Sequence, residues 1–209
     1  MTRAMKIAFC GHSHVRELET FRKSQEELRW PFDQRERYFK AFYCGGMLAR
    51  RLRPHEKLLM GRMSDWNPDV IILFIGDNDI DGSVPPCRRS DHAAFVAGRI
   101  LTFINRRRFR NVRVIVVPPI IRYGEHNNGY NIIRGLVYEQ LLLHSGSQSD
   151  FPHVSVLPLR ELTNTSRRHG RYFRDRQGVH LSSYGYRRLF REIIFNLSFT
   201  RYGLTVRER

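Results

Sequence analysis

Short apolar runs alternate along this chain with longer segments whose apolar residues recur at helical spacing. Five runs predict β-strands, at residues 6–10, 38–44, 70–75, 112–117 and 154–157. The third is an unbroken apolar series, which is typical of a parallel strand buried on both faces. Amphipathic helices are predicted at residues 15–30, 90–107, 130–144 and 182–197. Strands that alternate with helices predict an α/β fold with a parallel sheet and right-handed crossovers.

Two further expectations concern helix boundaries. The basic stretch that follows Gly46 and runs through Arg53 is expected to be helical. The helix over residues 90–107 is expected to have Ser90 or Asp91 as its N-cap and Phe95 among its apolar positions. Both expectations rest on local pattern alone.

Length and composition predict one domain. The chain has 209 residues, of which 41% are hydrophobic, and this is enough for a single core. Its longest apolar runs, 70–75 and 114–121, are far shorter than the ~20 residues of a membrane helix, so no membrane span is expected. The N-terminal residues lack the small-residue cleavage site of a secretory signal. We therefore expect a domain over residues 1–199, followed by a basic tail at 200–209.

Cysteine and histidine usage bears on redox chemistry and metals. Three cysteines are too few for a disulfide framework and indicate a reducing compartment, so an intracellular protein, cytoplasmic or nuclear, is predicted. His12 and His14 have no acidic or cysteine partner at ligand spacing, so no metal site is predicted. No phosphate-loop or dinucleotide fingerprint is present, and no cofactor is expected.

The chain is strongly basic. Lys and Arg number 36 against 20 Asp and Glu, which gives a formal net charge of +16, and only four of the basic residues are lysines. A field of this sign attracts polyanions in a salt-dependent manner, and RNA or DNA is the expected partner. The densest cluster, which is the predicted nucleic-acid contact, consists of Arg106, Arg107, Arg108 and Arg110.

Polar or glycine-rich residues follow the first three predicted strands and precede the last helix. Ser13 stands where the first strand turns into a helix, either as a nucleophile or as an N-cap. Gly45 and Gly46 allow a close approach of the backbone to a substrate or form an ordinary turn. Asn78 is an oxyanion donor or a turn residue, and His180 is a general base or a capping residue. Ligands of such sheets bind at this edge, beyond the carboxyl ends of the strands.

Taken in order, these four blocks resemble the SGNH (GDSL-like) hydrolase superfamily. The resemblance implies a three-layer, flavodoxin-like fold with a five-stranded parallel sheet in the order 2-1-3-4-5. It implies that Ser13 is the nucleophile of a serine esterase or acyl hydrolase and that His180 is its base. It also implies an oxyanion hole formed by the Ser13 amide, the Gly46 amide and the Asn78 side chain, with Gly45 as the alternative glycine.

The sequence departs from the pattern of this superfamily at two positions. His12 replaces the Asp that usually precedes the serine. Gln177 replaces the Asp three residues before His180, and without that carboxylate Ser-His-Asp enzymes lose orders of magnitude in rate. The Gln177 carbonyl oxygen could still accept the imidazole hydrogen bond, and Asp175 is the other candidate support for His180.

Four short segments carry a further resemblance, at residues 11–16 (GHSHVR), 45–46 (GG), 75–79 (IGDND) and 130–131 (YN). Within the superfamily, they are similar to the hydrolase-like domains encoded by animal retroelements, in which His before the serine is normal. This resemblance implies an accessory protein that acts on an ester near the element's own RNA or DNA. The alternative is a nucleic-acid-associated module with a weak or inactive hydrolase site.

Overall fold

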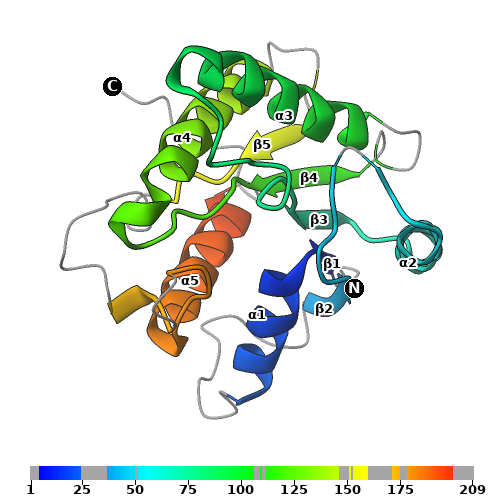
Figure 1. The fold of residues 1–209 in the computed structure, drawn as a ribbon. Helices are drawn as coiled ribbons and strands as arrows, with labels where there is room; N and C mark the ends of the chain where they lie inside the picture. Colours follow the sequence, from blue (N-terminus) through cyan, green and yellow to red (C-terminus); the bar gives the residue numbers. More distant parts are fainter. Residues whose placement is uncertain are drawn as a thin grey trace.

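A five-stranded sheet lies between two layers of helices in the computed structural model (Figure 1). The structure describes residues 5–24, 37–49, 51–105, 109, 112–145, 151, 153–159, 171–174 and 178–199. All neighbouring strands pair in parallel, in the order β2-β1-β3-β4-β5, which confirms the predicted fold class and strand order. The strands are β1 (Met5–Gly11), β2 (Arg37–Tyr43), β3 (Val70–Phe74), β4 (Arg113–Val117) and β5 (Val154–Val156).

Alternate residues of the central strands enter two separate cores, because successive side chains of a strand point to opposite faces. Ala8 and Cys10 of β1 pack with α2 (Pro54–Trp66), α3 (Arg89–Ile104) and α4 (Asn128–Leu143). Ile7 and Phe9 pack on the other face with α1 (Ser13–Ser24) and α5 (Ser183–Phe199). Short 3₁₀ helices, η2 (Pro86–Arg88) and η3 (Glu125–Asn127), precede α3 and α4. Strand β3 is buried along its whole length, as its sequence predicted.

The helix predicted to end at Arg53 is wrong, since α2 begins only at Pro54. Proline lacks an N–H and restricts the preceding residue to extended backbone, and Arg53 has φ −70° and ψ 162°. Pro54 therefore occupies the first position of the helix, where no N–H is needed. Residues 47–49 and 51–53, which precede it, form neither helix nor strand.

The predicted cap of α3 is also wrong, and so is the placement of Phe95. Helix α3 begins at Arg89, directly after η2, so Ser90 and Asp91 lie within its first turn. Phe95 is 49% exposed, whereas Val96 is fully buried. One residue corresponds to roughly 100° of helix rotation, and this turns Phe95 away from the sheet.

Several predicted residues lie outside the described part of the chain, namely Arg106, Arg107, Arg108, Arg110, Asp175, Gln177 and the tail at 200–209. Among the described helices, none combines the length and the apolar character that a membrane crossing requires.

Gly11, at the end of β1, has a backbone that only glycine accommodates. Its φ is +148°, and a Cβ at this position would collide with the carbonyl oxygen of Phe74 on the paired strand β3. We predict that Gly11→Ala lowers the free energy of unfolding by at least about 3 kcal/mol, measured by urea denaturation. The matched control is Gly98→Ala, at an exposed position of α3, where a Cβ meets nothing and stability should rise by about 0.5–1 kcal/mol. Equal stability of the two variants would contradict this account.

Candidate active site

The first three strands end side by side, and this brings their following loops to one edge of the sheet. Gly11 is paired both with Tyr43 of β2 and with Phe74 of β3. Ser13 follows Gly11 as the first residue of α1 and is half-buried. The loop after β2 carries Gly46, and the loop after β3 carries Asn78; both residues are exposed.

Hydrogen bonds hold these loops to one another. The Cys44 amide donates to the Gly11 carbonyl oxygen at 2.9 Å. The Asn78 Nδ2 donates to the carbonyl oxygen of Met47 at 3.2 Å, one residue beyond Gly46. Gly46 has φ +69°, a left-handed conformation that favours glycine. We call the loop after β2, which contains Gly45 and Gly46, the glycine loop. These hydrogen bonds fix it against the segments that carry Ser13 and Asn78.

His180 approaches the same edge from the segment before α5. Its ring centroid lies 6.0 Å from that of His14, the residue after Ser13. Its carbonyl oxygen accepts a hydrogen bond from the Arg174 amide at 2.8 Å. Ser182 Oγ accepts from the Gly185 amide at 3.2 Å and so satisfies an otherwise unpaired donor in the first turn of α5.

A buried polar pair that the sequence pattern did not predict lies beneath this edge. His12 is 1% exposed, and its Nε2 lies 2.9 Å from Oδ2 of Asp77, which is 7% exposed. The other Asp77 oxygen accepts hydrogen bonds from the Ile120 amide at 3.0 Å and the Tyr130 hydroxyl at 3.1 Å. The available signal was positional, because His12 and Asp77 each immediately precede a predicted site residue.

The protonation state of Asp77 follows from these contacts. Burial alone raises the pKa of a carboxyl group, but the charge and hydrogen bond of His12 and the hydrogen bond from the Ile120 amide outweigh it. The net pKa of Asp77 lies well below its ordinary value, so this residue is a carboxylate. The carboxylate therefore holds His12, the residue before Ser13, against Asp77, the residue before Asn78.

His14 is buried on the other side of Ser13, and its Nδ1 lies 2.9 Å from the Tyr186 hydroxyl of α5. Burial, reinforced by the charge of His12, lowers the pKa of His14 to about 3. His14 is therefore neutral at pH 7, and it serves to join α1 to α5.

The lowered pKa of His14 predicts a loss of stability in mild acid. In the unfolded chain this histidine binds a proton below pH 6.5, whereas the folded chain resists protonation until about pH 3. Between pH 7 and pH 5, we expect the free energy of unfolding to fall by about 2 kcal/mol through His14. Urea denaturation across this range should show the fall in the wild type and not in His14→Gln. His144→Gln, at an exposed histidine, is the matched control and should keep the wild-type dependence.

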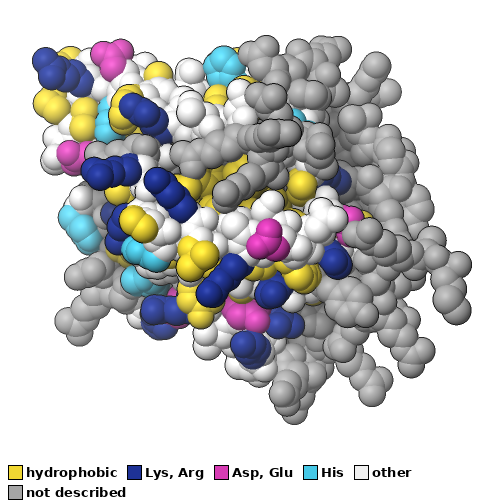
Figure 2. All heavy atoms as spheres, turned by 90° about the vertical axis from the view of Figure 1, so that its right-hand side faces the viewer, with side chains coloured by type: hydrophobic (Ala, Val, Ile, Leu, Met, Phe, Trp, Pro, Cys, Tyr) yellow, Lys and Arg dark blue, Asp and Glu magenta, His cyan; other side chains and the backbone are white. Residues whose placement is uncertain are grey.

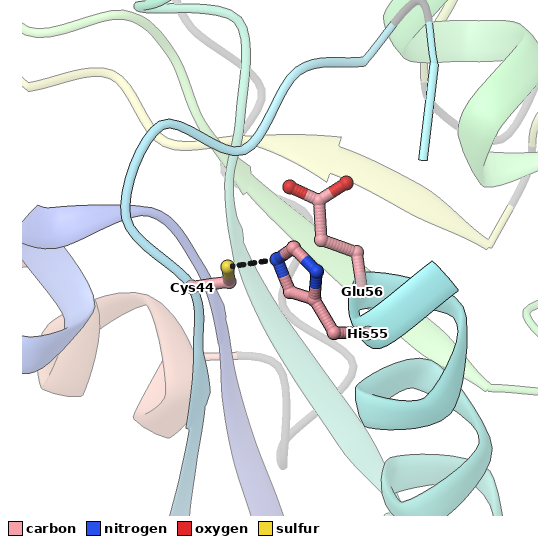
Figure 3. Close-up of side chains that lie close together, drawn as sticks. All are labelled: Cys44, His55 and Glu56. Atoms are coloured by element: carbon pink, nitrogen blue, oxygen red, sulfur yellow. Dashed lines mark hydrogen bonds between the residues drawn. The ribbon is translucent and has the colours of Figure 1, made fainter. Parts of the chain in front are cut away.

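A second cluster lies where the glycine loop meets the start of α2. In Figure 3 the His55 ring points toward the sulfur of Cys44, while the Glu56 carboxylate points away from that pair. The His55 Nε2 lies 3.1 Å from Cys44 Sγ, and the potential metal-ligand atoms of these three residues lie within 4.8 Å of one another. The buried Glu56, however, accepts hydrogen bonds from Arg53 Nε at 2.9 Å and Nη2 at 2.6 Å. A metal ion would have to displace this guanidinium.

The contact between Cys44 and His55 predicts selective thiol chemistry. His55 can accept the thiol proton as the Cys44 sulfur attacks an electrophile, so Cys44 should react with iodoacetamide about tenfold faster than the exposed Cys87. Cys10 should remain unmodified, since burial raises the pKa of its thiol to about 12. Peptide mass spectrometry at timed intervals measures all three rates. Equal rates at Cys44 and Cys87, or no slowing in His55→Gln, would overturn the prediction.

The fold is similar to those of solved structures that include lipases and a member of a lipolytic family, all of low sequence identity to this chain. A member of the lipolytic G-D-S-L family from Veillonella parvula superposes with a TM-score of 0.61 at 17% identity, covering 93% of this chain and 99% of that one. A lipase from a goat rumen metagenome gives 0.56 at 16% identity, with coverages of 92% and 97%. A GDSL-like lipase from Bacteroides thetaiotaomicron gives 0.52 at 12% identity, with coverages of 94% and 88%.

The chain has an SGNH hydrolase-like fold. No protein-family model matches the sequence, and no curated protein matches it either. The likeness therefore lies in the arrangement of the chain.

Proposed function

We propose that the protein is a serine esterase that hydrolyses acyl esters through an acyl-enzyme at Ser13. The observation that carries the proposal is the meeting of three strand-to-loop junctions and the segment before α5 at one edge of an SGNH hydrolase-like sheet. Ser13 stands at the N-terminus of α1, where the first backbone N–H groups have no partner within the helix and favour negative charge.

In the proposed reaction, Ser13 Oγ attacks the ester carbonyl carbon while His180 takes the hydroxyl proton. His180 then gives this proton to the departing alkoxide, and the acyl group remains on Ser13. A water molecule, deprotonated by His180, attacks the acyl-serine and releases the acid. The free serine is restored by the return of the proton from His180.

The oxyanion formed during each attack would be held by three N–H groups. These are the amides of Ser13 and Gly46 and the side-chain amide of Asn78. One Asn78 N–H bonds to the Met47 carbonyl oxygen, so the side chain is oriented and its second N–H is left for the oxyanion. The His12–Asp77 pair acts as a positioning element beneath Ser13 and Asn78.

His180 needs a partner that orients its ring, and we assign this role to Gln177, with Asp175 as the alternative. A glutamine carbonyl oxygen can fix the tautomer of the imidazole but cannot stabilise an imidazolium by charge. The expected rate is therefore lower than that of enzymes with a full Ser-His-Asp triad.

We further propose that the enzyme is an accessory protein of a retroelement that works inside the cell. The retroelement-like motifs around Ser13 and Asn78 and the net charge of +16 support this setting. The arginine cluster at residues 106–110 would then contact RNA or DNA. A nucleic-acid-bound module with a weak hydrolase site is the alternative function.

Phosphonylation by a fluorophosphonate probe tests the nucleophile directly, because the probe bonds to an activated serine with loss of fluoride. We expect labelling of the wild type, and none of Ser13→Ala or His180→Ala. Hydrolysis of p-nitrophenyl acetate should fall at least about 1,000-fold in both variants. Ser64→Ala and His144→Ala, at exposed positions, are the matched controls and should keep full labelling. Undiminished labelling of a folded Ser13→Ala protein would refute the assignment.

A further inference from the structure

A cavity of about 710 Å³ opens beside the glycine loop, between that loop, the start of α2 and α3. Gly46 is part of its lining, so the cavity adjoins the proposed oxyanion hole. Arg53 joins the cavity to the glycine loop, because it lines the cavity and its Nη2 donates to the Gly45 carbonyl oxygen at 2.9 Å. We call this cavity the basic pocket. Its volume suits an organic molecule of moderate size.

The pocket is lined by four cationic side chains and one acidic side chain. The acid, Glu56, is fully buried and already paired with Arg53. The other cations, Arg51, Lys57 and Arg99, are exposed and form no ion pair with any described residue. Figure 2 faces the side of the molecule that carries α2, and dark blue Lys and Arg side chains gather there among yellow apolar ones. The pocket therefore holds a positive charge that the described chain does not neutralise.

An aromatic ring stands beside these charges. Phe95 lines the pocket and is 49% exposed, and the Arg99 guanidinium carbon lies 4.9 Å from its ring centroid. Cations with an exposed ring suit a ligand that carries both an anionic group and an apolar or aromatic part. A phosphate group fits this lining better than a carboxylate, because its three terminal oxygens can accept from several cations at once.

We propose that the basic pocket binds a phosphate group carried by the ester substrate. The attribution of this phosphate to the substrate rests on the proposed esterase function, whereas anion binding by the pocket does not. A ligand with its phosphate among Lys57 and Arg99 and its ester carbonyl at Gly46 would span the cavity. The substrate class is thus a small phosphorylated acyl ester.

Binding of phenyl phosphate tests the pocket without any turnover. Isothermal titration of the full chain in low-salt buffer should show saturable binding that weakens as salt is added. Lys57→Gln and Arg99→Gln should each weaken it about three- to tenfold. Arg62→Gln removes an exposed charge from α2 outside the pocket lining, and binding should be unchanged. An absence of binding, or equal weakening by all three variants, would overturn the pocket.

Hydrolysis tests the assignment of the anion to the substrate. We expect kcat/KM for 4-acetoxyphenyl phosphate to exceed that for phenyl acetate by about tenfold, and the ratio to fall in Arg99→Gln but not in Arg62→Gln. Hydrolysis of both esters without preference would refute the substrate class. If neither ester is hydrolysed but phenyl phosphate binds, the proposed function fails and the anion site stands. Displacement of phenyl phosphate by an oligouridylate whose own binding depends more strongly on Lys57 and Arg99 would assign the pocket to nucleic acid and overturn the proposal.

Discussion

The buried hydrogen bond between His12 and Asp77 is the interaction on which the candidate site depends. It joins the residue before Ser13 to the residue before Asn78, and through Ile120 and Tyr130 it also reaches the loop after β4 and helix α4. Burial of a carboxylate away from water costs free energy unless its oxygens accept hydrogen bonds, and both Asp77 oxygens have such partners. Removal of either member would leave the other buried and incompletely paired. The hydrogen bonds that satisfy the buried Asp77 carboxylate therefore also set the distance between the segments that carry Ser13 and Asn78.

Charge has two distinct roles at the edge of the sheet. Arg53 is committed to the structure, because it pairs with buried Glu56 and binds the carbonyl oxygen of Gly45. Lys57 and Arg99 are held by no carboxylate of the described chain and face the cavity next to the same loop. A net charge of +16 gives the whole molecule a general attraction for anions. The basic pocket concentrates part of this positive charge in a cavity that adjoins Gly46.

The two cores and the edge of the sheet restrict the amino-acid sequence to different degrees. The two cores require apolar side chains of suitable volume, and many combinations of Val, Ile, Leu and Phe satisfy that requirement. The edge of the sheet is more exacting, because Gly11 and Gly46 have positive φ and the loops are joined by particular hydrogen bonds. The fold is accordingly similar in solved structures that are only 12–17% identical to this chain.

The succession of apolar runs and amphipathic segments by itself determined the α/β class and all five strands. A strand that is buried on both faces requires an unbroken apolar run, as in β3. The motif order around Ser13, Asn78 and His180 further determined the strand order through its resemblance to a known family. Local pattern failed where a neighbour decided the outcome: Pro54 delayed the start of α2, and the rotation of α3 exposed Phe95. Only the tertiary structure placed His12 against Asp77, Cys44 against His55, and Arg99 opposite the glycine loop. These residues are 65, 11 and more than 50 positions apart, and periodicity carries no information about which distant side chains meet when strands pair.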